Sequence, residues 1–170
     1  LTMHGIQLWT TLPRAMKMMP PRYQRIEASA IPEVALPGGA LRVIAGSFGT
    51  HAGPAAVLMP LLLWHVTLEA GARLETAIPA GFELGAYVID GRPDFGNGAM
   101  AATGELVVFE NRDGDIAVAN GGDGTADLLL LGGAPAEGPL VFHGPFVMNS
   151  IEQVRYAERA YMSGNMGVLA

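Results

Sequence analysis

Four histidines are the side chains of this sequence best suited to metal binding and to proton transfer at neutral pH. They are His4, His51, His65 and His143. None stands at the HxH or HxxxH spacing that brings two imidazoles together from one strand or helix. A metal site would therefore have to be assembled from distant segments. The sequence has no cysteine, which excludes disulfides, thiolate catalysis and cysteine-based zinc or iron–sulfur sites.

Glu83 is the carboxylate with the most distinctive setting, because it begins an apolar segment of strand character. If its side chain points inward, it could hold a ligand or a proton in a poorly solvated pocket. His65 and Tyr87, on other strand candidates, could line the same pocket. The alternative is structural: Glu83 pairs with an arginine or faces solvent at the mouth of a barrel, and His65 faces water.

Other catalytic arrangements find no support in the residue spacing. Asp113 and Asp115 lie in a polar turn and are better explained as solvated turn formers than as an acid–base pair. No GxSxG sequence is present, so a serine hydrolase triad would lack its nucleophile elbow.

Short strands joined by turns are expected to position these side chains. The 23 glycines and 12 prolines interrupt regular structure often, which favours many short strands over a few long helices. Eight candidates separated by Gly and Asp turn signals predict an all-β fold, a jelly-roll barrel or sandwich. The candidates are Leu41–Ser47, Ala56–Thr67, Arg73–Ile78, Phe82–Asp90, Leu106–Glu110, Asp115–Ala119, Ala126–Leu131 and Pro139–His143.

The two ends of the chain are expected to extend this fold. The alternation in Gly5–Thr11 predicts a strand, and the Pro- and Met-rich segment Leu12–Gly39 predicts an extended linker. Near the C-terminus, Asn149 or Ser150 can cap a helix that Gly164 ends. The predicted organisation is an N-terminal strand and linker (1–39), a β-barrel (40–148) and a C-terminal helix with its tail (149–170).

Charge and hydropathy narrow the choice of partners and location. A net charge of −6 disfavours direct binding to nucleic acid, which depends on Lys and Arg. The most apolar stretch, residues 55–68, is shorter than the roughly 20 residues that span a bilayer. We therefore expect a protein without nucleic-acid or membrane contacts, and the lack of cysteine and of a secretory signal favours the cytoplasm. The chain begins at Leu1, and we expect further sequence upstream of it.

Two regions of the sequence resemble a known family. They are His4–Trp9 (HGIQLW) with Pro20–Gln24 (PPRYQ), and His143–Asn149 (HGPFVMN), which leads into the predicted helix. Both are similar to signatures of the pirin family, and Arg42–Gly46 (RVIAG) also follows the second domain of that family. Pirins are similar to two stacked cupin barrels, of which the first carries an iron site of three histidines and one glutamate. This chain resembles the second barrel, which has lost its metal.

The resemblance implies that this barrel holds no metal. A cupin motif places a glycine, then HxH, then a glutamate before a closing glycine. Laid on this chain, the motif begins at Gly71, has Ala77 and Pro79 at the histidine positions and Glu83 at the acidic position, and ends at Gly91, one residue late. Alanine and proline cannot coordinate a metal ion. We therefore expect no cofactor in this chain, with iron belonging to an N-terminal domain of the intact protein.

A structural and interaction module is the leading functional hypothesis. Such a metal-free domain would support the N-terminal iron-binding cupin, and the resemblance implies a redox-linked regulatory role. The chain alone would then catalyse nothing. The alternative is that it forms part of a pirin-like quercetin 2,3-dioxygenase whose metal site lies in the N-terminal domain. A third option is a small-molecule pocket inside the barrel, lined by His65, Glu83 and Tyr87.

A candidate interface lies near the N-terminus, where Trp9, Met16, Met18 and Met19 form an apolar, deformable cluster, and His143 is assigned to it as well. The expected partner is the N-terminal cupin domain, with a second copy of the chain or another protein as alternatives. The cluster could instead pack on its own domain. If the predicted Gly5–Thr11 strand lies at a domain junction, the isolated chain would associate by strand exchange or edge pairing.

Overall fold

The computed structural model describes residues 4–166. Contacts between residues divide the chain into two compact units. Unit 1 combines the residues up to Pro21 with those from Ala136 onward, and unit 2 is Arg22–Pro135. These units do not coincide with the segments 1–39, 40–148 and 149–170, which remain a prediction about domains.

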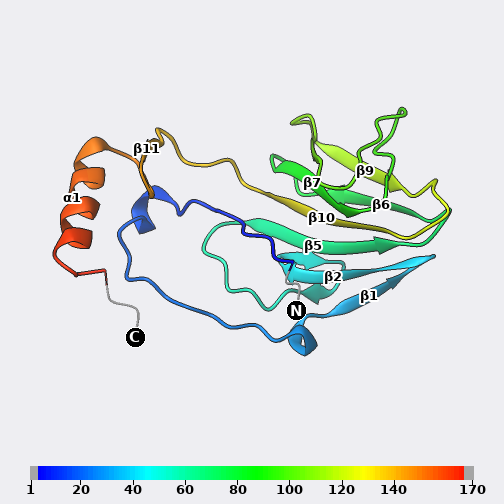
Figure 1. Cartoon of the computed structure of the whole chain (residues 1–170), viewed down its shortest axis with the longest axis horizontal. Coiled ribbons are helices and arrows are strands. Elements are labelled where there is room, and N and C mark those ends of the chain that lie inside the picture. The colour runs from blue at the N-terminus through cyan, green and yellow to red at the C-terminus, as the bar shows by residue number, and fades with distance from the viewer. Residues whose placement is uncertain (1–3, 167–170) are drawn as a thin grey trace. The chain divides into compact units, whose positions relative to one another are not determined.

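Unit 2 is an antiparallel sandwich of the cupin type, with one large sheet and one small one. The large sheet has six strands in the order β1-β2-β5-β10-β7-β8, and β5 and β10 run side by side in its middle (Figure 1). Its strands are β1 (Glu33–Leu36), β2 (Gly39–Ala45), β5 (Leu61–Leu68), β7 (Glu83–Asp90), β8 (Leu106–Val108) and β10 (Ala126–Gly133). The small sheet pairs β6 (Arg73–Ile78) with β9 (Gly114–Ala119), and a further hairpin joins β3 (Ser47–Phe48) to β4 (His51–Ala52).

The core of unit 2 follows from the period-two pattern of its strands. In β5, Leu62, Trp64, Val66 and Leu68 are buried while the residues between them are half-buried. Residues of β10, β7, β6 and β9 complete the same core. Each buried Leu or Val contributes about 1.5–3 kcal/mol relative to exposure. The two sheets therefore form an open sandwich around one apolar core, which confirms the predicted all-β class.

Unit 1 contains a two-stranded hairpin and the only α-helix of the described residues. The hairpin pairs β11 (Val141–His143) with β12 (Phe146–Met148), and the helix α1 spans Ile151–Met162. Short 3-10 turns occur at Arg14–Met16 in unit 1 and at Ala28–Ala30 in unit 2.

The helix begins and ends where the sequence predicts. Ser150 is the N-cap and accepts a 3.2 Å hydrogen bond from the Gln153 N–H, while the Gln153 side chain accepts a 2.8 Å hydrogen bond from the Asn149 N–H. The two bonds resemble a capping box, except that Gln153 accepts from the residue before the N-cap instead of from the N-cap itself. Gly164, with φ of 73°, follows the end of the helix. No helix within residues 4–166 is long and apolar enough to cross a bilayer.

Two predictions about the N-terminal 39 residues are wrong. Gly5–Thr11 forms no strand, because alternation alone does not supply a neighbouring strand with which to pair. The expected linker Leu12–Gly39 contains β1, which pairs with β2 from Glu33↔Arg42 to Leu36↔Gly39. Prolines at positions 32 and 37 flank this short strand. Because proline is unfavourable in regular strands, the sequence predicts a linker there instead of a strand.

Candidate functional site

The cupin-motif positions on β6 and β7 do not point into the sandwich. Leu74 is buried opposite Val118 of β9, so alternation turns the even-numbered residues of β6 inward. Ala77 and Pro79 are exposed. Their assignment to the inward histidine positions is therefore wrong by one residue. On that strand, Thr76 and Ile78 are the inward-facing residues nearest to the motif.

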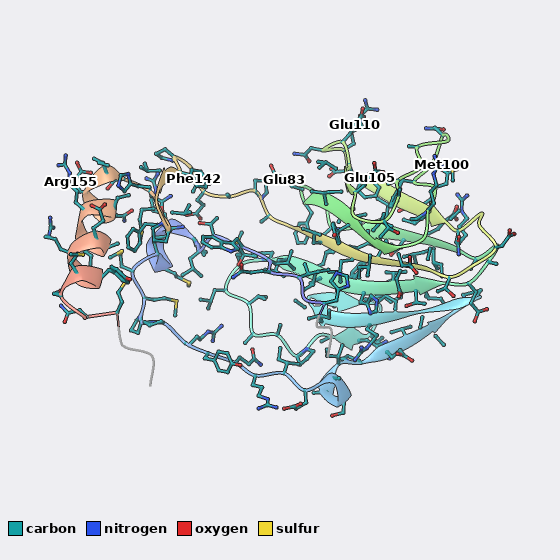
Figure 2. All side chains as sticks on the ribbon, viewed as in Figure 1. Glu83, Met100, Glu105, Glu110, Phe142 and Arg155 are labelled. Carbon is teal, nitrogen blue, oxygen red and sulfur yellow. The ribbon has the colours of Figure 1, made fainter. Side chains whose placement is uncertain are left out.

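Glu83 also lies outside the core. It is exposed at the start of β7, whereas the next residue, Leu84, is 7% exposed and belongs to the core; Figure 2 labels Glu83 at this place. The glutamate thus follows the alternative of the sequence analysis, exposure at the mouth of the sandwich. Nearby, the backbone N–H of Gly81 donates a 2.9 Å hydrogen bond to Asp113, which agrees with a turn-forming role for that aspartate.

The core of the sandwich is built mainly from apolar side chains. Two edge-to-face pairs of aromatic rings contribute to this core or pack against it, Phe48 with Trp64 at 5.3 Å and Phe95 with Phe109 at 6.0 Å between centroids. A first-row metal in a cupin needs several imidazole or carboxylate ligands that converge. The inward positions of β6 and β7 carry aliphatic side chains and one threonine hydroxyl. Among residues 4–166, no group of three His, Asp or Glu side chains is placed to hold a metal ion.

His65 and Tyr87 lie on the outer face of the six-stranded sheet. Both are register partners of Leu129, His65 from β5 and Tyr87 from β7. His65 Nε2 lies 3.3 Å from Asp127 Oδ1, to which the Thr67 hydroxyl donates a 2.6 Å hydrogen bond. Their strand neighbours face the core, and a ligand pocket formed by His65, Glu83 and Tyr87 remains a prediction.

A pocket of about 470 Å³ lies within unit 1. It is bordered by the N-terminal segment around Trp9 and Leu12 and by the β11–β12 hairpin. Lys17 is in its wall, and the Nζ of this lysine donates a hydrogen bond to Thr11 Oγ1. Burial lowers the pKa of Lys17, while the carboxylate of Glu137 acts in the opposite direction. The pocket is mainly apolar, with Phe142, Phe146 and Met148 contributed by the hairpin.

Hydrogen bonds between distant segments hold unit 1 together. The Arg14 N–H donates to Glu137 Oε2 at 2.6 Å, and the Arg14 guanidinium donates to the Gly138 carbonyl at 2.5 Å. Asn149, which is buried, donates through Nδ2 to the carbonyls of Glu137 and Pro139 at 2.8 and 3.0 Å. Asn149, the last residue of the HGPFVMN motif, thus stabilises the segment before β11 through two hydrogen bonds. Sequence reasoning missed this role because its partners lie 10 to 12 residues away.

The PPRYQ motif also has a structural role that the sequence did not reveal. Gln24 donates to the Pro54 carbonyl at 2.9 Å and accepts from the Ala56 N–H at 2.8 Å, and Arg22 donates to the Ala56 carbonyl at 2.6 Å. These bonds fix the loop between β4 and β5 within unit 2. Tyr23, between the two, is 89% exposed.

The surface of unit 1 is rich in exposed apolar side chains. Trp9 is 69% exposed and also borders the pocket, and all three methionines of the candidate interface are exposed. His143 is exposed and lies 3.0 Å from Glu158 of α1. Figure 2 labels Phe142, which is exposed on the same unit. The other exposed apolar side chains of unit 1 are Ile6, Leu8, Ile151, Tyr156, Tyr161, Met162 and Met166. That these residues contact a partner remains a prediction.

The fold places this chain in the cupin class. Over residues 63–167 the sequence matches the family described as the pirin C-terminal cupin domain. The chain is 36% identical to the Pseudomonas aeruginosa protein PA2418, which has a provisional name as a quercetin 2,3-dioxygenase, over 96% of this chain and 57% of that protein. Mouse pirin is 30% identical over 91% of this chain and 54% of its own length. The chain belongs to the pirin family, as its motifs indicated.

A solved structure supports the same assignment at the level of the fold. The crystal structure of a quercetin 2,3-dioxygenase from Acinetobacter baumannii has a TM-score of 0.87 and 29% identity, covering 95% of this chain and 56% of that one. The chain therefore spans little more than half the length of the relatives that it matches.

Proposed function

We propose that this chain is a structural and interaction module: unit 2 is a metal-free cupin scaffold, and unit 1 is a docking surface for a second, metal-binding cupin domain of the pirin type. The observation that carries the proposal is the contrast between the apolar interior of unit 2 and the exposed apolar surface of unit 1. The first supports a scaffold role without a metal, and the second supports a role in docking.

A cupin domain is the partner favoured by the features of unit 1. Exposed apolar patches of this kind mark protein interfaces. The β11–β12 hairpin has only two strands, and an isolated pair is marginally stable in water. A sheet from a second domain would supply both an apolar cover and a neighbour for the hairpin. The matched relatives contain enough additional sequence for such a domain.

A binding experiment with separate halves tests this proposal. The chain would be mixed with the part of the Pseudomonas aeruginosa relative that it does not match, and the complex measured by sedimentation velocity. We expect a one-to-one complex. Met162→Glu, at an 83% exposed position of α1, should weaken it at least about tenfold, since it places a charge at an apolar interface. The matched control is Val108→Glu, at a 74% exposed position of unit 2.

Two outcomes would count against docking through unit 1. The halves would remain separate at all concentrations, or the two substitutions would weaken the complex equally. In the second case a charge anywhere on the surface would explain the loss.

The second candidate function is participation in a quercetin 2,3-dioxygenase. It is favoured by the name of the Acinetobacter protein, whose structure matches nearly the whole chain. Because the core of unit 2 is mainly apolar, this second candidate places the metal in another domain. Oxygen uptake with quercetin should then be absent for the chain alone and present for the complex of the two halves. Metal-dependent uptake by the chain alone would overturn the assignment of unit 2 as metal-free.

A further inference from the structure

Lys17 is the only lysine in the sequence, and it lies in the wall of the unit 1 pocket. Its neighbours in that wall are mainly apolar. A protonated lysine has three N–H donors, and in the described part of the chain Thr11 Oγ1 is the acceptor for one of them. The desolvation that lowers its pKa indicates that the charge is incompletely compensated by its surroundings.

The shape of the pocket suits a small molecule. Its volume of about 470 Å³ falls within the range of roughly 300–1,000 Å³ that is usual for small-ligand sites. Aromatic rings from Trp9, Phe142 and Phe146 border it, and such rings favour flat or aliphatic hydrocarbon groups. One cation in a mainly apolar cavity, whose other polar side chains are Thr10 and Thr11, favours a ligand with one negative group and a hydrocarbon body.

We infer that this pocket binds a small apolar carboxylate, with the carboxylate paired to the Lys17 ammonium and the hydrocarbon part against Phe142 and Phe146. The Thr11 hydroxyl holds the ammonium at the wall of the pocket. The pocket shares Trp9, Phe142 and the β11–β12 hairpin with the proposed docking surface, so a docked partner would compete with the ligand for them. The inference is therefore tested on the chain alone.

The test compares a carboxylate with a neutral molecule of the same shape. Isothermal titration calorimetry would measure binding of 2-naphthoate and of 2-naphthamide to the chain. We expect the carboxylate to bind about tenfold more tightly, the effect of one charge-assisted hydrogen bond in a partly desolvated site. Lys17→Met keeps an apolar side chain of similar length and should abolish this preference while 2-naphthamide still binds.

Arg155→Met is the matched control, since it removes one positive charge from an exposed position of α1 and leaves the pocket intact; Figure 2 labels Arg155 on the helix. It should keep the full preference for the carboxylate. The inference is overturned by any of three results: no binding of 2-naphthoate to the unaltered chain, an equal affinity for the two probes, or the same loss of preference in both variants. The last result would mean that overall charge, not Lys17, selects the ligand.

Discussion

Units 1 and 2 distribute their apolar side chains in opposite ways. In unit 2, strands alternate so that one face of each is buried in a shared core. In the described part of unit 1, Val154 and Ala157 are the buried apolar residues, and most of the large ones are exposed. A unit with so little core depends on hydrogen bonds between its segments and on whatever covers its surface. Unit 2 therefore resembles a self-sufficient domain, and unit 1 resembles one side of an interface.

The largest expected effect comes from the core of unit 2. Leu130→Ala, at a fully buried position of β10, should lower the free energy of unfolding by about 3 kcal/mol, through lost transfer free energy and a residual cavity. Met162→Ala in unit 1 should change it by less than about 0.5 kcal/mol because the side chain is exposed. Urea unfolding followed by circular dichroism measures both. Similar losses for the two variants would remove the contrast between the units.

A second substitution tests whether polar contacts hold unit 1 together. Asn149→Ala removes the two hydrogen bonds to the carbonyls of Glu137 and Pro139. We expect a loss of about 2 kcal/mol confined to unit 1, because the freed carbonyls are left without these donors. Hydrogen exchange should accelerate at the amides of α1 and β12 and stay unchanged in β5 and β10. Uniform acceleration in both units would show that they unfold as one.

Gln24 provides the corresponding test in unit 2, where packing rather than polar contacts dominates. Gln24→Ala removes the two-point contact with the loop between β4 and β5, at a cost of about 1 kcal/mol. Faster hydrogen exchange at Ala56 is the expected signature. Tyr23→Ala, at the exposed neighbouring position, is the control and should leave that exchange rate as it is.

The smallest effect concerns the pH dependence introduced by Lys17. Burial makes its pKa lower in the folded chain than in the unfolded chain. Between these two values the unfolded chain binds more protons, so the contribution of Lys17 to the free energy of unfolding rises with pH. Lys17→Met should therefore be more stable than the unaltered chain near neutral pH. That advantage should shrink toward pH 10.5, the ordinary value for lysine. The measurement is the free energy of unfolding of both chains as a function of pH. A difference between the two chains that stays constant up to pH 10.5 would contradict this prediction.

The fold could be read from the sequence where the signal was local. The limits of β6 were predicted correctly, and the helix cap was predicted to be Asn149 or Ser150, of which Ser150 is the observed one. Alternation and capping depend on residues only a few positions apart. Which face of β6 points to the core was not predicted correctly. The choice between Ala77 and Ile78 depends on how β6 pairs and packs in the folded sheet, and β6 pairs with the distant strand β9. The Lys17 pocket was missed for a similar reason: its walls come from segments more than 120 residues apart, joined by the Arg14–Glu137 bond.

The central position of β10 has a consequence for synthesis on the ribosome. β10 pairs with both β5 and β7, yet it is made after them. Until its residues emerge, these two older strands lack their shared neighbour, and their apolar faces are open to chaperones and to other nascent chains. We expect a ribosome-bound chain that ends before residue 126 to be cut readily by protease in β5, and one that extends well past residue 133 to resist. Equal sensitivity of the two would show that the sheet closes without β10.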